Sequence, residues 1–351
     1  MKHFVKICKT SHQRIHFSVK KFTIKRLANL LILYFCKTIE EEYFKRHLNS
    51  KKEMIKHLSE IVDAAKNKTT RKIAVAAAAD QHVLEAIQNA RKEGIVEPIL
   101  IGDKRAIEAI AKKIKFDLTG IRIVDIEDAK DASAEAVKLI RNGEADILMK
   151  GLVSTGILLK CVLDKEVGLR KGATLSHVAV FETPFYHKLL GVTDAAMNVS
   201  PDLEQKIAII INAVDAFHRL GNPNPKVAIV GSVETVNPKM EATMHAATIS
   251  MMNYRKQIKG CIIDGPLAID NAVSKKAAEL KDITSEVAGD VDIILGPDID
   301  GANILYKTLN FLGGATAAAV IMGATVPIVL TSRADSEKSK FLSIALAAAI
   351  G

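Results

Sequence analysis

The feature that most constrains this chain is an alternation of short apolar runs with longer amphipathic segments, which begins near Met54 and continues to Gly351. Apolar runs such as "KIAVAAA" and "ADILMK" are typical of strands that are buried on both faces. Segments such as "HVLEAIQNARKEG" carry apolar residues at helical spacing. Because strands that alternate with helices form parallel sheets covered by helices, the sequence predicts an α/β protein with two sheets.

The length of the chain sets how many cores it can form. A chain of 351 residues can bury two cores, so we expect one bilobed unit or two domains. The hydrophobic content of 48% and the mean hydropathy of +0.15 argue against disorder. The four cysteines, at positions 8, 36, 161 and 261, show no paired spacing, which favours a reduced, cytoplasmic protein without a structural zinc site.

The net charge of +9 is confined to one end of the chain. Residues 1–53 contain 13 of the 49 basic residues and 4 of the 40 acidic ones, which leaves 36 of each sign in the remainder. A nucleic-acid-binding body would need its own basic face, so the balanced remainder argues against a nucleic-acid partner.

Residues 1–53 allow three interpretations. Their apolar run from Leu27 to Cys36 has ten residues, well short of the roughly 20 that span a bilayer. The segment also lacks the A-x-A site of a secretory signal. A membrane-surface anchor and a transit-like presequence stay open, but we favour an extraneous or disordered extension before a native start at Met54. Deletion of residues 1–53 is then expected to leave folding and activity intact.

Polar residues gather where the expected strands end. In open parallel sheets ligands bind beyond the carboxyl ends of the strands. Each turn by itself is typical of an ordinary strand–helix connection with a helix N-cap. Together they predict a shared cleft. The seven turns read "MKGLVSTG", "FETP", "TDAAMN", "GSVETVNPK", "IDGPLA", "LGPDIDGAN" and "LTSRAD".

Several common catalytic motifs are missing from the sequence. It has no G-x-G-x-x-G after the first strand, no P-loop, no H-E-x-x-H and no G-x-S-x-G. Its histidines show no metal-ligand spacing, and Cys161 and Cys261 are predicted to be packing residues. The histidines interpreted as satisfied structural residues are His177, His187, His218 and His245.

At the strand ends the sequence resembles a known family. The segments "MKGLVSTGILLKCVLDKEVGLRKG", "LSHVAVFE", "KGCIIDGPLAID", "GPDIDGANILYKTLNFLGG" and "TVPIVLTSRADS" are similar to the phosphate acetyl/butyryltransferase family, and most of all to its phosphate butyryltransferase branch. The resemblance runs from about Met54 to Gly351.

The resemblance implies an activity and an architecture. Members exchange a short acyl group between CoA and inorganic phosphate and use no metal or bound cofactor. The resemblance further implies a cytoplasmic enzyme of fatty acid metabolism that forms a homodimer or a higher homo-oligomer. Two α/β domains with largely parallel sheets flank a cleft, as in isocitrate and isopropylmalate dehydrogenases. The implied domains are residues 54–172 plus 315–351, and residues 173–314. A direct ternary-complex mechanism without an acyl-enzyme is expected.

The stretch "LTSRAD" supplies the expected catalytic residues. In the family its Ser-Arg lies at the reacting centre, and Arg333 suits the two-point binding of a phosphate. Ser332, with Thr331, can donate to the oxyanion that develops on the thioester carbonyl. Acetyl-transferring relatives place a general base two helical turns later, where this chain has Ser339. Asp335 is our candidate base, with a helix cap as its rival role, and Glu337 is the next candidate.

Further residues are candidates for binding phosphate and CoA. Lys160 stands where relatives often have arginine, and Arg170 follows in "VGLRKG". Asn303 and Lys307 lie one turn apart on the helix after "GPDIDGAN", whose amino end suits an anion. Asp264 and Asn198 are expected to line the cleft, and a purely structural role stays open for each.

Three other functions are alternatives. The acyl group can be acetyl rather than butyryl, because one methylene changes binding by only about 1–3 kcal/mol. A non-catalytic CoA-binding regulatory module is a second alternative. An oxidoreductase with the same architecture would need a D-x-x-x-D metal pattern, which Asp292, Asp298 and Asp300 do not form.

Overall fold

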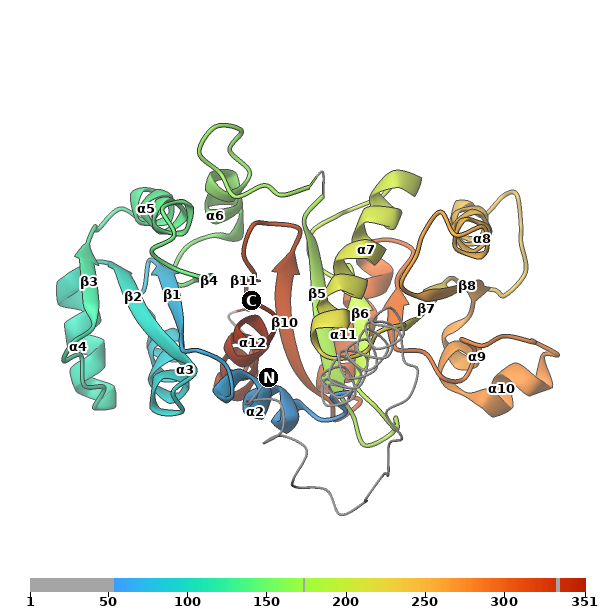
Figure 1. Cartoon of the computed structure of the whole chain (residues 1–351), viewed down its shortest axis with the longest axis horizontal. Helices are drawn as coiled ribbons and strands as arrows, with labels where there is room; N and C mark the ends of the chain where they lie inside the picture. Colours follow the sequence, from blue (N-terminus) through green and yellow to red (C-terminus); the bar gives the residue numbers. More distant parts are fainter. Residues whose placement is uncertain (1–53, 173, 333–334) are drawn as a thin grey trace, which may run out of the picture. The chain divides into compact units, whose positions relative to one another are not determined.

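Eleven strands of the described chain join in one mixed sheet, in the order β3-β2-β1-β4-β11-β10-β5-β6-β9-β7-β8 (Figure 1). The structure is a computed structural model that describes residues 54–172, 174–332 and 335–351. The predictions for residues 1–53 and for Arg333 fall outside the described residues. The α/β class is confirmed. The prediction of two sheets is wrong, because pairing of β10 with β5 joins the strands of both predicted sheets into one.

The elements follow the predicted alternation. The strands are β1 (Arg71–Ala76), β2 (Val96–Gly102), β3 (Arg122–Asp125), β4 (Ile147–Lys150), β5 (Ser176–Glu182), β6 (Leu190–Thr193), β7 (Lys226–Val230), β8 (Ile262–Leu267), β9 (Ile293–Leu295), β10 (Thr316–Met322) and β11 (Ile328–Val329). The helices are α2 (Leu58–Lys66), α3 (Gln81–Lys92), α4 (Lys104–Ile114), α5 (Ala129–Arg141), α6 (Thr155–Val162), α7 (Leu203–Arg219), α8 (Glu241–Tyr254), α9 (Ile269–Val273), α10 (Lys275–Leu280), α11 (Ile299–Phe311) and α12 (Glu337–Ile350).

The strands do not all run in one direction. β1, β2, β3, β4 and β11 are mutually parallel, and so are β6, β7, β8 and β9. Between the two groups the direction reverses three times, from β11 to β10, from β10 to β5 and from β5 to β6. The carboxyl ends of the two groups therefore point to opposite edges of the sheet. The prediction that all seven polar turns share one cleft is wrong in this respect, because an apolar run does not encode strand direction.

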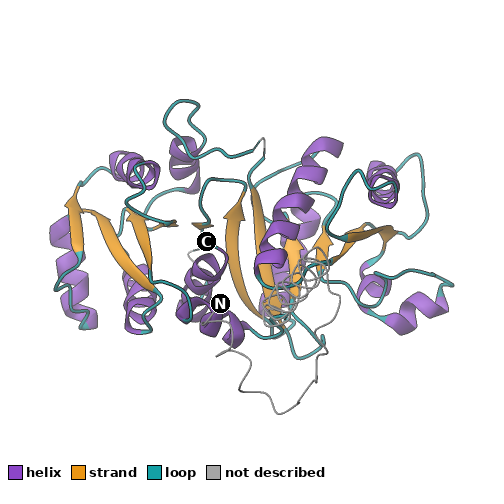
Figure 2. Ribbon diagram, viewed as in Figure 1, coloured by secondary structure: helices purple, strands orange, loops and turns teal. Residues whose placement is uncertain are grey.

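Helices cover both faces of the sheet (Figure 2). One core cluster joins one face to α2, α3, α7 and α12, a second joins the other face to α5 and α6, and a third lies under α11. In β1, Ile73 and Val75 belong to the first cluster and Ala74 and Ala76 to the second. This two-sided burial explains why the strand sequences are apolar without alternation.

The sheet is incomplete beside β10, because β11 has only two residues. β11 ends at Val329, before it can pair with Ala319 of β10. The Ala319 N–H instead donates to Ser343 Oγ of α12 at 2.9 Å, and Ser343 Oγ–H donates to the Ser339 carbonyl at 2.7 Å. The hydroxyl of a helix thus replaces a strand partner, and the chain after Val329 is free to form the site described below.

Ser343→Ala is expected to destabilise the protein by about 1–3 kcal/mol, because it leaves the buried Ala319 N–H without an acceptor. Urea unfolding gives the measurement. Ser133→Ala is the matched control, since the buried Ser133 hydroxyl only donates to a carbonyl of its own helix. Equal losses in the two variants would show that Ser343 does not complete the sheet.

The strand order separates two parts of the chain. The six strands from residues 54–172 and 315–351 lie together at one end of the order, and the five from residues 173–314 lie together at the other. In the described sheet these six strands join the other five where β10 pairs with β5. Residues 54–351 form a single compact unit, and the division into two domains stays a prediction.

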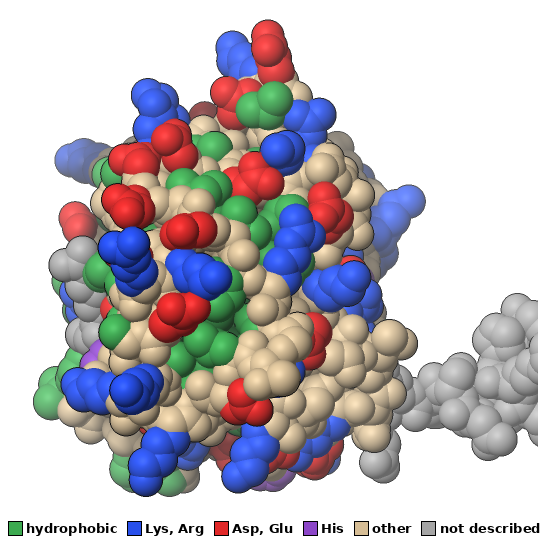
Figure 3. Space-filling view, turned by 90° about the vertical axis from the view of Figure 1, so that its left-hand side faces the viewer, with side chains coloured by type: hydrophobic (Ala, Val, Ile, Leu, Met, Phe, Trp, Pro, Cys, Tyr) green, Lys and Arg blue, Asp and Glu red, His purple; other side chains and the backbone are tan. Residues whose placement is uncertain are grey.

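The surface at the β3 end of the sheet carries both signs of charge. Basic and acidic side chains are interspersed on this face (Figure 3). Lys104 and Glu108 of α4 form an ion pair, and Arg122 of β3 pairs with Glu144. This face therefore lacks the single-sign basic field that nucleic acid requires. Within the described residues no helix is both long enough and apolar enough to cross a bilayer.

Candidate functional site

A cavity of about 240 Å³ lies at the carboxyl ends of β1, β4 and β11. β1 leads to β2 on one side, whereas β4 lies on its other side, so this is a topological switch point of the sheet. Open α/β sheets bind ligands at such points. The lining residues are Asp80, His82, Val83, Lys150, Gly151, Leu152, Thr331, Ser332 and Lys340.

The backbone after β4 passes close to the backbone after β1 at the cavity. Gly151 N–H donates to the Ala76 carbonyl at 2.8 Å, and Leu152 N–H donates to the Ala77 carbonyl at 2.7 Å. A Cβ at position 151 would lie only 2.2 Å from the Ala77 oxygen. Only glycine fits here, because any side chain would push the two strand ends apart. The glycine in "MKG" therefore shapes the wall of the cavity.

Two lysines that line the cavity are buried, with 8% of Lys150 and 3% of Lys340 exposed. Lys150 Nζ donates to the carbonyl oxygens of Gly151 and Val153, each at 3.2 Å. A buried lysine needs hydrogen-bond acceptors for its ammonium group, and these two carbonyl oxygens are such acceptors. Two positive charges at a small polar cavity suit an anionic ligand.

The turn at the end of "LTSRAD" is held by Asp335 and Lys340. Asp335 Oδ2 accepts from the Ser332 N–H at 2.6 Å, and the Asp335 N–H donates to the Ser332 carbonyl at 3.2 Å. Lys340 Nζ donates to the Ser332 and Asp335 carbonyls at 3.1 and 2.6 Å. The N-cap of α12 is Ser336, whose Oγ accepts from the Ser339 N–H. Asp335 is therefore not the helix cap.

Asp335 also lies near an aromatic cluster on β5 and α11. His177 and Phe181 each meet the Tyr306 ring edge-to-face, with centroids 5.6 and 5.3 Å apart. Burial, reinforced by the charge of Asp335, raises the pKa of Tyr306 to about 12. Burial lowers the pKa of His177, and this effect outweighs the negative charges of Asp194 and Asp335, which raise it. His177 is therefore neutral at pH 7. Its buried Nδ1 has no partner among the described residues, so the prediction of a satisfied histidine is wrong here.

The turn after β6 holds two predicted residues in structural contacts. Asp194 is 4% exposed and accepts from four backbone N–H groups, those of His177, Ala196, Met197 and Asn198. Asn198 Nδ2 donates to Asp194 and to the Leu175 carbonyl. Asn303 Nδ2 donates to the Ala195 carbonyl at 2.8 Å, which ties α11 to this turn. Both asparagine amides thus fix loops in place.

Several predicted binding residues do not reach the Ser332 cavity. Lys160 is exposed and lines a separate groove between α5 and α6. The backbone of Arg170 forms an isolated β-bridge with Ala324, on the chain before β11, whereas Ser332 lies after β11. Asp264 lies on β8, six strand spacings from β11 or roughly 25–30 Å away. Lys307 is exposed on α11.

The two cysteines in the described residues, Cys161 and Cys261, behave as packing residues. Burial raises the pKa of the Cys261 thiol to about 11 and raises the pKa of Cys161. Neither thiol is therefore poised as a nucleophile. In the described part of the chain, no three His, Cys, Asp or Glu side chains come close enough to hold a metal ion.

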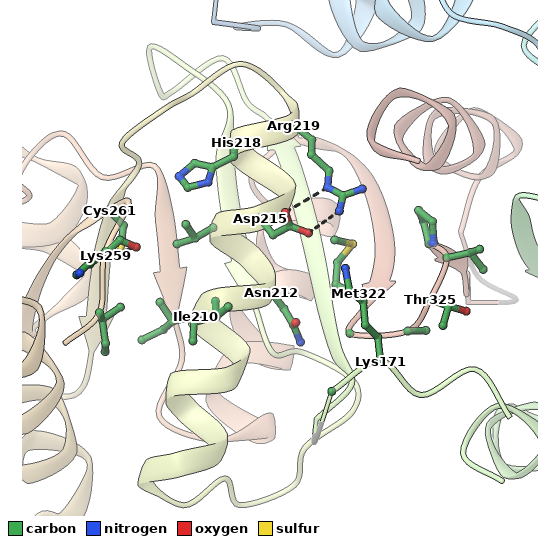
Figure 4. Close-up of a pocket in the computed structure, with 18 residues that line it drawn as sticks. Lys171, Ile210, Asn212, Asp215, His218, Arg219, Lys259, Cys261, Met322 and Thr325 are labelled. Atoms are coloured by element: carbon green, nitrogen blue, oxygen red, sulfur yellow. Dashed lines mark hydrogen bonds and ion pairs between the residues drawn. The ribbon is translucent and has the colours of Figure 1, made fainter. Parts of the chain in front are cut away.

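A second cavity, of about 480 Å³, lies between α7 and the turn that joins β10 to β11 (Figure 4). Asp215 and Arg219 form an ion pair on one wall, and Lys171, Met322 and Thr325 lie on the opposite side. None of the predicted catalytic or binding residues lines it. We assign the candidate site to the Ser332 cavity, since it combines the switch point with buried charge.

Sequence reasoning missed Lys150 and Lys340 as site residues. Lys150 has a readable signal, because a lysine that ends the apolar run "ADILMK" must be buried with its strand. Lys340 stands among polar residues in "ADSEKSK", and nothing in that pattern separates it from the exposed Lys338. Only the packing of α12 decides which of the two is buried.

Comparisons with known proteins identify the family. The family model for phosphate acetyl/butaryl transferase matches residues 56–136 and 127–348. The chain is 49% identical to the phosphate butyryltransferase of Clostridium acetobutylicum, covering 85% of this chain and 99% of that protein. It is 48% identical to the phosphate acetyltransferase of Thermotoga maritima, covering 83% and 98%.

A solved structure shows the same relationship. The branched-chain phosphotransacylase of Enterococcus faecalis V583 matches with a TM-score of 0.70 and 32% identity, over 80% of this chain and 99% of that one. On this evidence, the chain belongs to the phosphate acetyl/butaryl transferase family.

Proposed function

We propose that this protein transfers a short acyl group between CoA and inorganic phosphate, with phosphate bound in the Ser332 cavity. The observation that carries the proposal is the convergence of Ser332 with the buried Lys150 and Lys340 on one cavity. At about 240 Å³ the cavity is smaller than the roughly 300–1,000 Å³ of drug-sized ligand sites, which suits an inorganic anion better than a whole CoA molecule.

The proposed chemistry is a direct displacement. A phosphate oxygen attacks the thioester carbonyl carbon, the new C–O bond forms, the C–S bond breaks, and the CoA thiolate leaves. Ser332 and Thr331 are proposed to stabilise the developing oxyanion. Arg333 is proposed to bind phosphate at two points. In the reverse direction Asp335 is proposed to take the proton of the CoA thiol.

A ternary complex fits the residues better than a covalent intermediate. Both described cysteines have raised pKa values, and a nucleophilic thiol needs a lowered one. We propose that charge comes from lysine and arginine side chains, without a metal or a bound cofactor. Initial-rate lines that intersect, and activity that survives EDTA, are the expected results. Parallel lines would indicate an acyl-enzyme.

The acyl group is the finer part of the proposal. We favour butyryl or a short branched chain, and the near-equal identities to a butyryltransferase and an acetyltransferase keep acetyl as the alternative. Release of CoA from acetyl-, butyryl- and isobutyryl-CoA, with and without phosphate, tests the function and the preference together. CoA that raises the melting temperature without any phosphate-dependent turnover would instead support a non-catalytic CoA-binding module.

Assembly and location are also proposals. We propose a cytoplasmic homodimer that serves fatty acid metabolism, as the family resemblance implies. Exposed apolar side chains on α8, namely Met244, Met251 and Tyr254, offer an apolar surface for a second subunit. Sedimentation equilibrium of the full chain is the test, and a monomer at micromolar concentration would contradict the dimer.

A further inference from the structure

Lys340 is the most unusually placed charge in the described residues that line the Ser332 cavity. It is the fourth residue of α12, close to the helix N-terminus, where a positive charge is unfavourable. It is also 3% exposed, so its ammonium group has lost nearly all contact with water. A lysine that is both buried and close to a helix N-terminus is locally unfavourable on two counts, which points to a functional requirement.

The contacts of Lys340 show what that requirement is. Its ammonium group bonds to the carbonyl oxygens of Ser332 and Asp335, the two described residues that flank the Arg333 position. An ammonium group has three donors. Among the described residues these two carbonyls are its only acceptors, and the side chain lines the cavity. One donor and a full positive charge are thus left for a ligand.

We infer that Lys340 is both the brace of the Ser332–Asp335 turn and a direct ligand of the phosphate substrate, so that phosphate binding and the geometry of the catalytic turn depend on one ammonium group. This inference rests on the proposed function and adds a residue to it. It also places the phosphate on the side of the cavity that α12 forms. A phosphate that accepts the third donor completes the hydrogen bonds of Lys340 and offsets its buried charge.

Lys340→Met tests the inference, with Lys338→Met as the matched control. Lys338 lies on the same helical turn and is exposed, so the control removes the same charge without touching the cavity. For Lys340→Met the KM for phosphate is expected to rise about 10- to 100-fold, the effect of one charge-assisted hydrogen bond. The KM for the acyl-CoA should change by less than about twofold, since CoA does not use this donor.

A readout independent of turnover separates binding from support of the fold. Inorganic phosphate is expected to raise the melting temperature of the wild-type protein and of Lys338→Met, and to leave that of Lys340→Met unchanged. Lys340→Gln is the second variant, because its amide keeps a donor for the two carbonyls but carries no charge. It should fold, even where the methionine variant does not, and still lose the phosphate effect.

The outcomes distinguish this inference from the function on which it rests. A wild-type protein without phosphate-dependent release of CoA would overturn the proposed function itself. An active wild type whose Lys340 variants keep the phosphate KM and the phosphate-induced stabilisation would overturn only the role of Lys340. A fall in melting temperature alone, with unchanged affinity for phosphate, would reduce Lys340 to a structural brace and so also contradict the inference.

Discussion

Asp335→Asn is expected to keep the fold and to lose roughly 10²-fold or more in the turnover of acyl phosphate with CoA. The structure makes this substitution a sharp test. The Oδ2 atom of Asp335 accepts from the Ser332 N–H at 2.6 Å, and the amide oxygen of asparagine can accept the same bond. The turn is therefore preserved, while the negative charge and its ability to take a proton are removed.

The rival role of Asp335 as a helix cap no longer explains a loss of activity, because Ser336 caps α12. Glu337→Gln is the matched control. Glu337 is exposed and its carboxylate accepts from Asn89 of α3, so its loss should leave turnover unchanged. Turnover that survives in Asp335→Asn but falls in Glu337→Gln would move the base to Glu337.

A second readout reports on the charge directly. The charge of Asp335 helps to raise the pKa of Tyr306, so Asp335→Asn should lower that pKa below about 12. Ultraviolet titration of the tyrosines measures the change. A titration identical to that of the wild type would show that the carboxylate does not face this cluster.

Arg333→Lys is expected to weaken phosphate-dependent transfer by roughly 10- to 100-fold, because lysine keeps the charge but loses the paired hydrogen bonds that guanidinium makes to a phosphate. The basis is the sequence, in which Arg333 directly follows Ser332 of the cavity. The ratio kcat/KM for phosphate, measured at a fixed acyl-CoA concentration, gives the result.

Lys160→Ala provides the contrast. Lys160 is exposed and lines the groove between α5 and α6, so its removal should change kcat/KM by less than about threefold, as for most exposed charges. Equal losses in Arg333→Lys and Lys160→Ala would mean that the phosphate cation has been misassigned and that the α5–α6 groove takes part in the reaction.

The sequence by itself predicted the local structure and the family. Apolar runs and helical spacing are properties of neighbouring residues, so the alternating elements and the α/β class could be read without coordinates. The glycine-containing turns and "TSRAD" are also contiguous, and they carried the resemblance that the comparisons confirm. Ser332 and Thr331 were identified in this way, and both line the cavity at the switch point.

Only the tertiary structure decided which strand ends meet. The direction of a strand is set by its partners across the sheet, so the three reversals around β10 and β5 separate Asp264 from Ser332, and no local pattern encodes that separation. Tertiary packing also decides which charged side chains are buried. Lys338 and Lys340 are two residues apart on one helix, and the packing of α12 against the incomplete part of the sheet buries only Lys340. The contacts that surround an ammonium group, more than its position in the sequence, determine what it can bind.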